Sequence, residues 1–165
     1  MISTIQHEPS APETTFPSIE SILPHRGTML LLDAVVICTD DLLLASASVD
    51  ERAWYADAQG AMPAWIGIEL MAQAIAAHVG LLAMRAGGTA LPGVLLGSRR
   101  YIAKLPAFFG GTKLCVEAKV LLRSEGGYGA YECTIRQGQI ECAEAVIKVF
   151  QPDDFQSFIE GSFQS

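Results

Sequence analysis

A single carboxylate interrupts the most apolar stretch of the chain, GAMPAWIGIELMAQAIAAHVG, residues 60–80. This carboxylate is Glu69, and Gln73 follows four residues later. Burying an ionised carboxylate costs free energy unless the group is paired, protonated or directed into a polar cavity. A carboxylic acid in apolar surroundings is also suited to exchange a proton with a reacting group. Glu69 is therefore the first candidate for general acid–base chemistry.

A histidine could complete such a pair, and the chain has three. At about 100° per residue, Glu69 and Gln73 share one face of a helix, whereas His78 lies about 180° from Glu69. We therefore expect His78 in the core or in an interface. His7 falls in the N-terminal segment, which leaves His25, in ILPHRGTMLLLD, as the histidine that could meet Glu69.

Each of these residues also has a purely structural interpretation. Glu69 could form an ion pair with an arginine such as Arg26 or Arg99. His25 could pack the N-terminal turn with its hydrogen bonds satisfied. Gln73 could bind a backbone carbonyl or Glu69 itself, and we favour this interpretation for Gln73.

The hydrophobic pattern of the sequence predicts the helices and strands that must position these side chains. Pro63 and the pair Gly87–Gly88 are typical start and stop signals, which predict one helix of about 20 residues between them. Residues 18–23 favour a short helical turn. Strands are expected twice within residues 32–49, and then in VLLGSRRYIA, KLCVEAKVLLR, YGAYECTIR and IECAEAVIKVF.

This element order predicts an α+β fold, in which an antiparallel sheet of about six strands wraps around one long central helix. A helix that is apolar on nearly all sides must be covered on nearly all sides. One sheet covers only part of it, so we expect a partner subunit and therefore an oligomer. Insertion of this helix into a membrane would be costly because it carries the polar residues Glu69, Gln73, His78 and Arg85. We therefore expect no association with a membrane.

Composition narrows the class of protein further. The formal net charge of -7 over 165 residues argues against nucleic acid, because neutralising phosphates needs a basic face. Residues 1–17 lack the pattern of a secretory signal and are expected to form a flexible arm. The spacing of the four cysteines matches no zinc site, so we expect reduced thiols, no metal, no cofactor and a cytoplasmic protein. A single domain at 18–152 and a tail at 153–165 complete the expected organisation.

Three stretches resemble the β-hydroxyacyl-acyl carrier protein dehydratases of fatty acid synthesis. ILPHRGTMLLLDAVV resembles their opening, AMPAWIGIELMAQAIAAHVG their central helix, and LLGSRRYIAKLPAFFGGTKLCVEAKV their third and fourth strands. The likeness runs from about Ile19 to Phe150, and PAWIGIE and LLGSRRY are most similar to dehydratase-like proteins of aryl polyene pigment biosynthesis. The resemblance implies the hotdog fold, a dimer formed by joining sheets, and removal of water from a (3R)-3-hydroxyacyl thioester to give the trans-2-enoyl thioester.

Two departures from the family pattern concern the site. The family carboxylate and glutamine carry over to Glu69 and Gln73, but the family histidine, in a Gly-His-Phe-x-Gly turn, does not. The matching region reads ERAWYADAQGAMP, with Tyr55 in the place of the histidine. Ala64 replaces the glycine whose N–H polarises the substrate carbonyl, although alanine keeps that N–H.

The chemistry of dehydration, which needs an acid, a base and donors to the thioester oxygen, suggests roles for these residues. Glu69 would protonate the departing hydroxyl, and His25 is the first candidate for the base, with Tyr55 and Asp57 behind it. The N–H groups from Ala64 to Gly67 would hold the thioester oxygen, with Gln73 and Tyr55 also near the substrate.

Acyl carrier proteins are acidic, so an acidic enzyme needs a local basic surface to bind them. Arg99, Arg100 and Lys104 form the densest cationic cluster and are the candidate, although they could equally be a solvated strand face. The missing histidine supports an alternative, a non-catalytic hotdog subunit that completes a heterodimer with an active dehydratase. An acyl thioesterase is the third possibility, because hotdog enzymes also hydrolyse acyl thioesters.

Overall fold

The computed structural model describes residues 15–162. Most of the predicted arm at 1–17, and the last residues of the predicted tail at 153–165, lie outside this range. In chain order the elements are α1 (Ile19–Ile22), η1 (Gly27–Met29), β1 (Ala34–Cys38), β2 (Leu42–Ser48), β3 (Met62–Pro63), η2 (Ala64–Ile66), α2 (Gly67–Arg85), β4 (Val94–Ala103), β5 (Ala107–Phe108), β6 (Lys113–Arg123), β7 (Tyr128–Gln137), β8 (Ile140–Phe150) and α3 (Phe155–Ser162).

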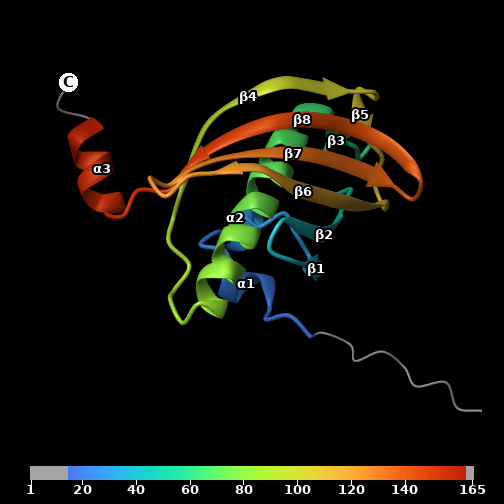
Figure 1. Cartoon of the computed structure of the whole chain (residues 1–165). Helices are drawn as coiled ribbons and strands as arrows, with labels where there is room; N and C mark the ends of the chain where they lie inside the picture. The colour runs from blue at the N-terminus through green and yellow to red at the C-terminus, as the bar shows by residue number, and fades with distance from the viewer. Residues whose placement is uncertain (1–14, 163–165) are drawn as a thin grey trace, which may run out of the picture.

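Six strands form one antiparallel sheet in the order β1-β2-β6-β7-β8-β4, and the sheet curves around α2 (Figure 1). The predicted hotdog architecture is therefore confirmed. A second pairing, between the two-residue strands β3 and β5, was not predicted. Two residues are too short to show the alternation by which a strand is recognised in a sequence.

The alternation of apolar residues in β6 accounts for its buried face only over part of the strand. Alternation in KLCVEAKVLLR predicts that Leu114, Val116, Ala118, Val120 and Leu122 share one face. The first three are buried, but the pairing of β6 with β7 shifts between Val120 and Leu122. A β-bulge disrupts the alternation of the strand, and beyond it both Leu121 and Leu122 are exposed, at 52% and 59%.

Helix α2 is buried on the side of the sheet and partly open on the other side. It is long and apolar enough to span a membrane by length and composition, yet it is the central helix of this domain. Its side chains Leu70, Ala74 and Ala77 are fully buried. The side away from the central strands β2 and β6 carries a stripe of partly exposed residues that is apolar except for its first member: Glu69, Ala72, Ala76 and Val79.

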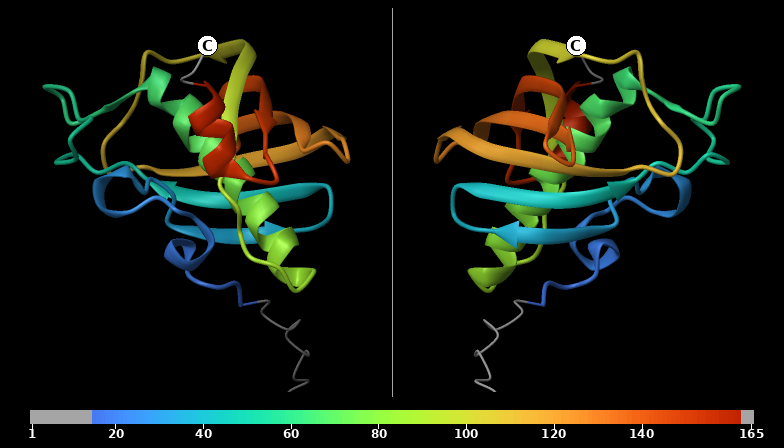
Figure 2. Two further views of the ribbon diagram at one scale, coloured as in Figure 1. Left: turned by 90° about the vertical axis from the view of Figure 1, so that its left-hand side faces the viewer. Right: turned by 90° about the vertical axis from the view of Figure 1, so that its right-hand side faces the viewer.

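Figure 2 shows the domain from two opposite sides, and in the left view α3 lies in front of α2. Helix α3, within the predicted tail, is joined to the sheet by contact of Phe158 with Phe150, whose ring centroids are 5.4 Å apart. Strand β4 has a neighbour only on its β8 side among the described residues, so its other edge is unpaired.

His78 lies in the core, as its helix position predicted, and joins three elements. Nε2 is 2.8 Å from the Thr39 carbonyl oxygen, which can only accept, so Nε2 carries the proton. Nδ1 therefore accepts from the Tyr131 hydroxyl at 3.2 Å. Burial is the largest cause that lowers the pKa of His78, so the neutral ring is the native form.

This histidine makes stability depend on pH. In the unfolded chain His78 binds a proton near its ordinary pKa of about 6.5, whereas the folded protein resists protonation. The neutral ring of His78 therefore contributes its full stabilisation of the fold above about pH 6.5. As the pH falls below this value, the free energy of unfolding decreases by at most about 1.4 kcal/mol per pH unit for one group. We expect the urea midpoint to fall between pH 7.5 and 5.5, and the fall to be smaller in His78→Gln. An equal fall in both proteins would contradict this assignment.

Candidate active site

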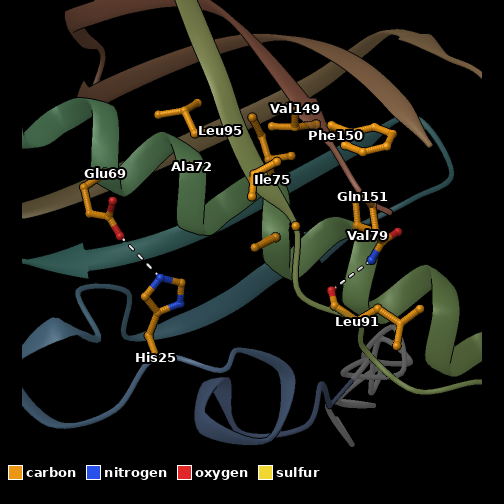
Figure 3. A pocket seen from close by; sticks show the side chains of 13 residues that line it. His25, Glu69, Ala72, Ile75, Val79, Leu91, Leu95, Val149, Phe150 and Gln151 are labelled. Atoms are coloured by element: carbon orange, nitrogen blue, oxygen red, sulfur yellow. Dashed lines mark hydrogen bonds and ion pairs between the residues drawn. The ribbon is translucent and has the colours of Figure 1, made fainter. Parts of the chain in front are cut away.

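Glu69 and His25 meet at the start of α2. His25 Nε2 lies 3.4 Å from Glu69 Oε1, and the two side chains are 29% and 38% exposed, respectively (Figure 3). Glu69 lies in the first turn of α2, and His25 comes from the loop between α1 and η1. His25 is thus within reach of Glu69, as expected from the positions of the three histidines.

The loop that carries His25 is held by its own residues. Arg26 Nη1 donates to the carbonyl oxygens of Leu23 and His25, at 2.6 and 2.7 Å, and so bonds its own loop. Gly27 follows with a φ of 56°, a left-handed conformation that glycine adopts without steric cost. His25 Nδ1 is buried and has no hydrogen-bond partner within residues 15–162. A histidine that only packed this turn would have its buried nitrogen satisfied.

Gln73 connects the carboxylate to the same loop. Its side-chain oxygen accepts from the Leu31 N–H at 2.9 Å, and its Nε2 donates to the Met29 carbonyl at 2.7 Å. Nε2 also donates to Glu69 Oε1 at 2.8 Å. The side chain is fully buried, so this amide orients Glu69 and fastens the segment after His25 to the helix. These contacts fit the structural interpretation of Gln73, and they occupy both ends of its amide.

A cavity of about 240 Å³ extends from this pair along α2. One wall is the apolar stripe of the helix, and the other is formed by the start of β4 and the end of β8 (Figure 3). The cavity therefore places a polar pair at one end of a mostly apolar space, as ligand sites commonly do. Its lining residues are His25, Glu69, Ala72, Ile75, Ala76, Val79, Leu91, Gly93, Val94, Leu95, Val149, Phe150 and Gln151.

Two of the backbone N–H groups between Ala64 and Gly67, which were expected to be free, are hydrogen-bonded within the protein. The Ala64 N–H donates to the Pro106 carbonyl at 3.0 Å, as part of the pairing of β3 with β5. The Gly67 N–H donates to the Ala64 carbonyl. These two N–H groups are therefore not free to hold a substrate oxygen in this conformation, which corrects the roles expected for them. The groups of Trp65 and Ile66 remain at the positive end of the helix.

Gly67 has a different function, which the sequence did not reveal. The Tyr101 hydroxyl donates to the Ala64 carbonyl, directly beside Gly67. A methyl group on Gly67 would overlap that hydroxyl, so glycine is required for Tyr101 to approach the start of α2. Burial raises the pKa of Tyr101 to about 12, which keeps the hydroxyl a donor. A tyrosine inside a strand pattern carries no signal that its hydroxyl reaches a helix.

Tyr55 and Asp57, the other candidates for the base, hold their own loop together. The Tyr55 hydroxyl accepts from the Asp50 N–H at 3.0 Å, and its ring is buried. Asp57 Oδ1 accepts from the N–H groups of Gln59 and Ala61, both at 2.9 Å. Neither residue lines the cavity, so the structure brings His25 to Glu69 and leaves Tyr55 apart from that pair.

The predicted basic cluster of Arg99, Arg100 and Lys104 does not act as one group, because Lys104 is paired with a carboxylate. Lys104 Nζ lies 2.8 Å from Glu141 Oε1, and the hydrogen bond from Lys104 is the main cause that lowers the pKa of Glu141. Arg99 and Arg100 are exposed on β4, where the pairing with β8 shifts between residues 99 and 102. Arg100 has a φ of 55°, which is uncommon for a residue other than glycine. Within residues 15–162 neither Arg99 nor Arg100 forms an ion pair, although Arg100 lines a surface hollow with Glu132 and Glu144.

The chain is similar to a chain of a solved dehydratase complex. The dehydratase heterocomplex ApeI:P from Xenorhabdus doucetiae contains a chain that is 26% identical, with a TM-score of 0.83. The match covers 88% of this chain and 97% of that chain. No curated protein matches the chain.

Other matches show the fold alone. The E. coli PaaI protein from the phenylacetic acid degradation operon is 15% identical, with a TM-score of 0.57, over 72% of this chain and 78% of that chain. A hypothetical thioesterase from Streptococcus pneumoniae, solved with coenzyme A, has the same identity and TM-score, over 73% and 88%.

The family comparison covers nearly the whole described chain. A model of the ApeP-like family, described as ApeP dehydratase, matches residues 17–160. This range includes the paired residues Glu69 and His25, the full sheet and most of α3. The predicted resemblance to dehydratase-like proteins of aryl polyene biosynthesis is thereby confirmed. The chain belongs to the ApeP-like dehydratase family.

Proposed function

We propose that this protein takes part in removing water from a 3-hydroxyacyl thioester carried by an acyl carrier protein. The observation that carries the proposal is the contact of Glu69 with His25, at one end of an apolar cavity along α2. An acyl chain needs such a cavity, and dehydration needs an acid and a base at the carbons next to the thioester. The product is the trans-2-enoyl thioester.

The two side chains divide the proton transfers. His25 takes the proton from C2 of the substrate, and the electrons of the C2–H bond form the C2–C3 double bond. The C3–O bond breaks as Glu69 donates a proton to the departing hydroxyl, which leaves as water. Gln73 donates to Glu69 Oε1, and this leaves Oε2 for the transferred proton. The positive end of α2 favours the negative charge that develops on the thioester oxygen.

The test is hydration of an enoyl thioester, the reverse reaction, by the purified protein. We expect loss of the enoyl absorbance with substrate on carrier protein or on coenzyme A, and a large reduction of this rate in His25→Ala. Since Arg26 holds the loop through backbone carbonyls, this variant should keep its fold, which circular dichroism checks. Full turnover by His25→Ala would remove His25 from the mechanism. Release of free thiol instead of hydration would indicate a thioesterase.

A second candidate function is that of a supporting subunit in a heterodimer with an active dehydratase. Three observations favour it: the partly exposed apolar stripe of α2 beside β4, the unpaired edge of β4, and the similarity to a chain of a heterocomplex. The loop at 51–61 also lacks the family histidine. Activity that is absent from the purified protein, and present after a second hotdog subunit is added, would establish this role.

The exposed arginines give a prediction about carrier protein. Because Lys104 is engaged by Glu141, we propose that Arg99 and Arg100 carry most of the attraction to an acidic carrier. Replacing both by glutamate is expected to weaken carrier-protein binding about tenfold or more at low salt, and to leave turnover of the coenzyme A thioester nearly unchanged. Lys148→Glu, an exposed position on β8, is the control. Equal binding by the double variant and wild type would exclude this surface.

A further inference from the structure

The two ends of the cavity are built differently. At one end Glu69 and His25 present polar atoms to the space. The far end lies beside Val79, where Gln151 Nε2 donates to the Leu91 carbonyl at 2.9 Å (Figure 3). This hydrogen bond joins the segment after β8 to the segment before β4. It therefore closes the side of the cavity that is most distant from the acid–base pair.

The distance between these ends follows from the helix. Val79 is ten residues after Glu69, which corresponds to about 15 Å at 1.5 Å per residue. Between them the helix contributes Ala72 and Ala76, whose small side chains leave the space open. Extended carbon chains advance about 1.3 Å per atom, so this length matches about ten to twelve carbons.

The far end can open without disturbing the sheet. The main chain of Gln151 is fixed separately, because its N–H donates to the Gly127 carbonyl at 2.9 Å. Only the side chain makes the bond to Leu91, at an exposed position. The neighbouring loop is close to β8, since a methyl group on Gly93 would lie 3.2 Å from the Phe150 carbonyl oxygen. Loss of the Gln151 side chain would thus lengthen the cavity while the loop stays in place.

We propose that Gln151, through its bond to Leu91, sets the longest acyl chain that the site accepts. The inference rests on the proposed function, because it assigns the substrate of the same cavity as an acyl chain of medium length. Chains longer than about twelve carbons would need the bond to break, whereas shorter chains leave it intact. Gln151 is thus a specificity-determining residue and takes no part in the proton transfers.

Two variants test this from opposite directions. Gln151→Ala removes the closure, and Ala76→Leu fills the middle of the cavity. Saturated acyl thioesters of about 6, 10 and 16 carbons are used for binding by calorimetry, and the matching enoyl thioesters for turnover. We expect Gln151→Ala to raise the ratio of 16-carbon to 10-carbon binding about tenfold or more, and Ala76→Leu to lower the ratio of 10-carbon to 6-carbon binding similarly. Gln156→Ala, exposed on α3, is the control and should match wild type.

The two readouts separate this inference from the proposed function. If both variants shift the preferred acyl length in binding but no turnover is found, the role of Gln151 is supported. The same result counts against catalysis by this protein alone. Turnover with a length profile that neither variant moves would support the proposed function and overturn the role of Gln151. A shift in Ala76→Leu alone would keep the acyl chain in the cavity but would likewise exclude Gln151 as its limit.

Discussion

Replacing Glu69 with glutamine is expected to lower the rate of enoyl thioester hydration by about 10²–10⁴-fold, the usual contribution of a general acid or base. Glutamine has nearly the same size, and it can still accept a hydrogen bond from Gln73. What it lacks is a proton that it can transfer at neutral pH. The measurement is the rate of loss of the enoyl absorbance, in the assembly that shows activity.

A matched control separates the chemistry from the change in charge. Glu125→Gln makes the same substitution at an exposed turn, and its rate should equal that of wild type. The thermal midpoint of Glu69→Gln should stay close to wild type, because the partly exposed carboxylate is replaced by a neutral group with similar contacts. An undiminished rate in Glu69→Gln would show that this carboxylate is structural, and with it the proposed division of roles would fail.

Replacing Gln73 with leucine should have the second large effect, on stability and activity together. The Leu31 N–H would lose its acceptor in a buried position, which costs about 1–3 kcal/mol for a single group. The Met29 carbonyl and Glu69 would each lose a donor as well. We expect a total loss of about 2–4 kcal/mol, and a lower rate because the loop of His25 is no longer fastened to α2.

The stability loss is measured by urea unfolding, and the activity by the same hydration assay. Gln59→Leu, at an exposed position in the loop before α2, is the control for adding an apolar side chain, and it should unfold like wild type. If Gln73→Leu were as stable as wild type, the three hydrogen bonds of this amide would not hold the loop in solution. If it were destabilised but fully active, the position of His25 would not depend on Gln73.

The long elements were predictable because each depends on a local pattern, whereas the pair Glu69–His25 was reached by excluding the other histidines. The spacing of Glu69 and His78 on a helix excluded one histidine, and this left His25 for the contact that the structure has. The six main strands were predictable for the same reason, since each is long enough to show alternation or an apolar run.

Features that depend on pairing between distant residues were not predictable. The Ala64 N–H is occupied because a two-residue strand brings Pro106 to it, and no periodic signal marks so short a strand. Lys104 was grouped with the arginines by its position in sequence. It meets Glu141 only because of the register between β4 and β8, which a single sequence does not specify.

The contact of Tyr101 with the start of α2 has a mechanical consequence. Tyr101 belongs to β4, the strand whose outer edge is unpaired, and its hydroxyl donates to the carbonyl of Ala64, three residues before the first turn that carries Glu69. Displacement of β4 would therefore act on the start of α2 through this hydrogen bond. We expect that a partner bound along the unpaired edge of β4 would shift the position of Glu69 by the same route.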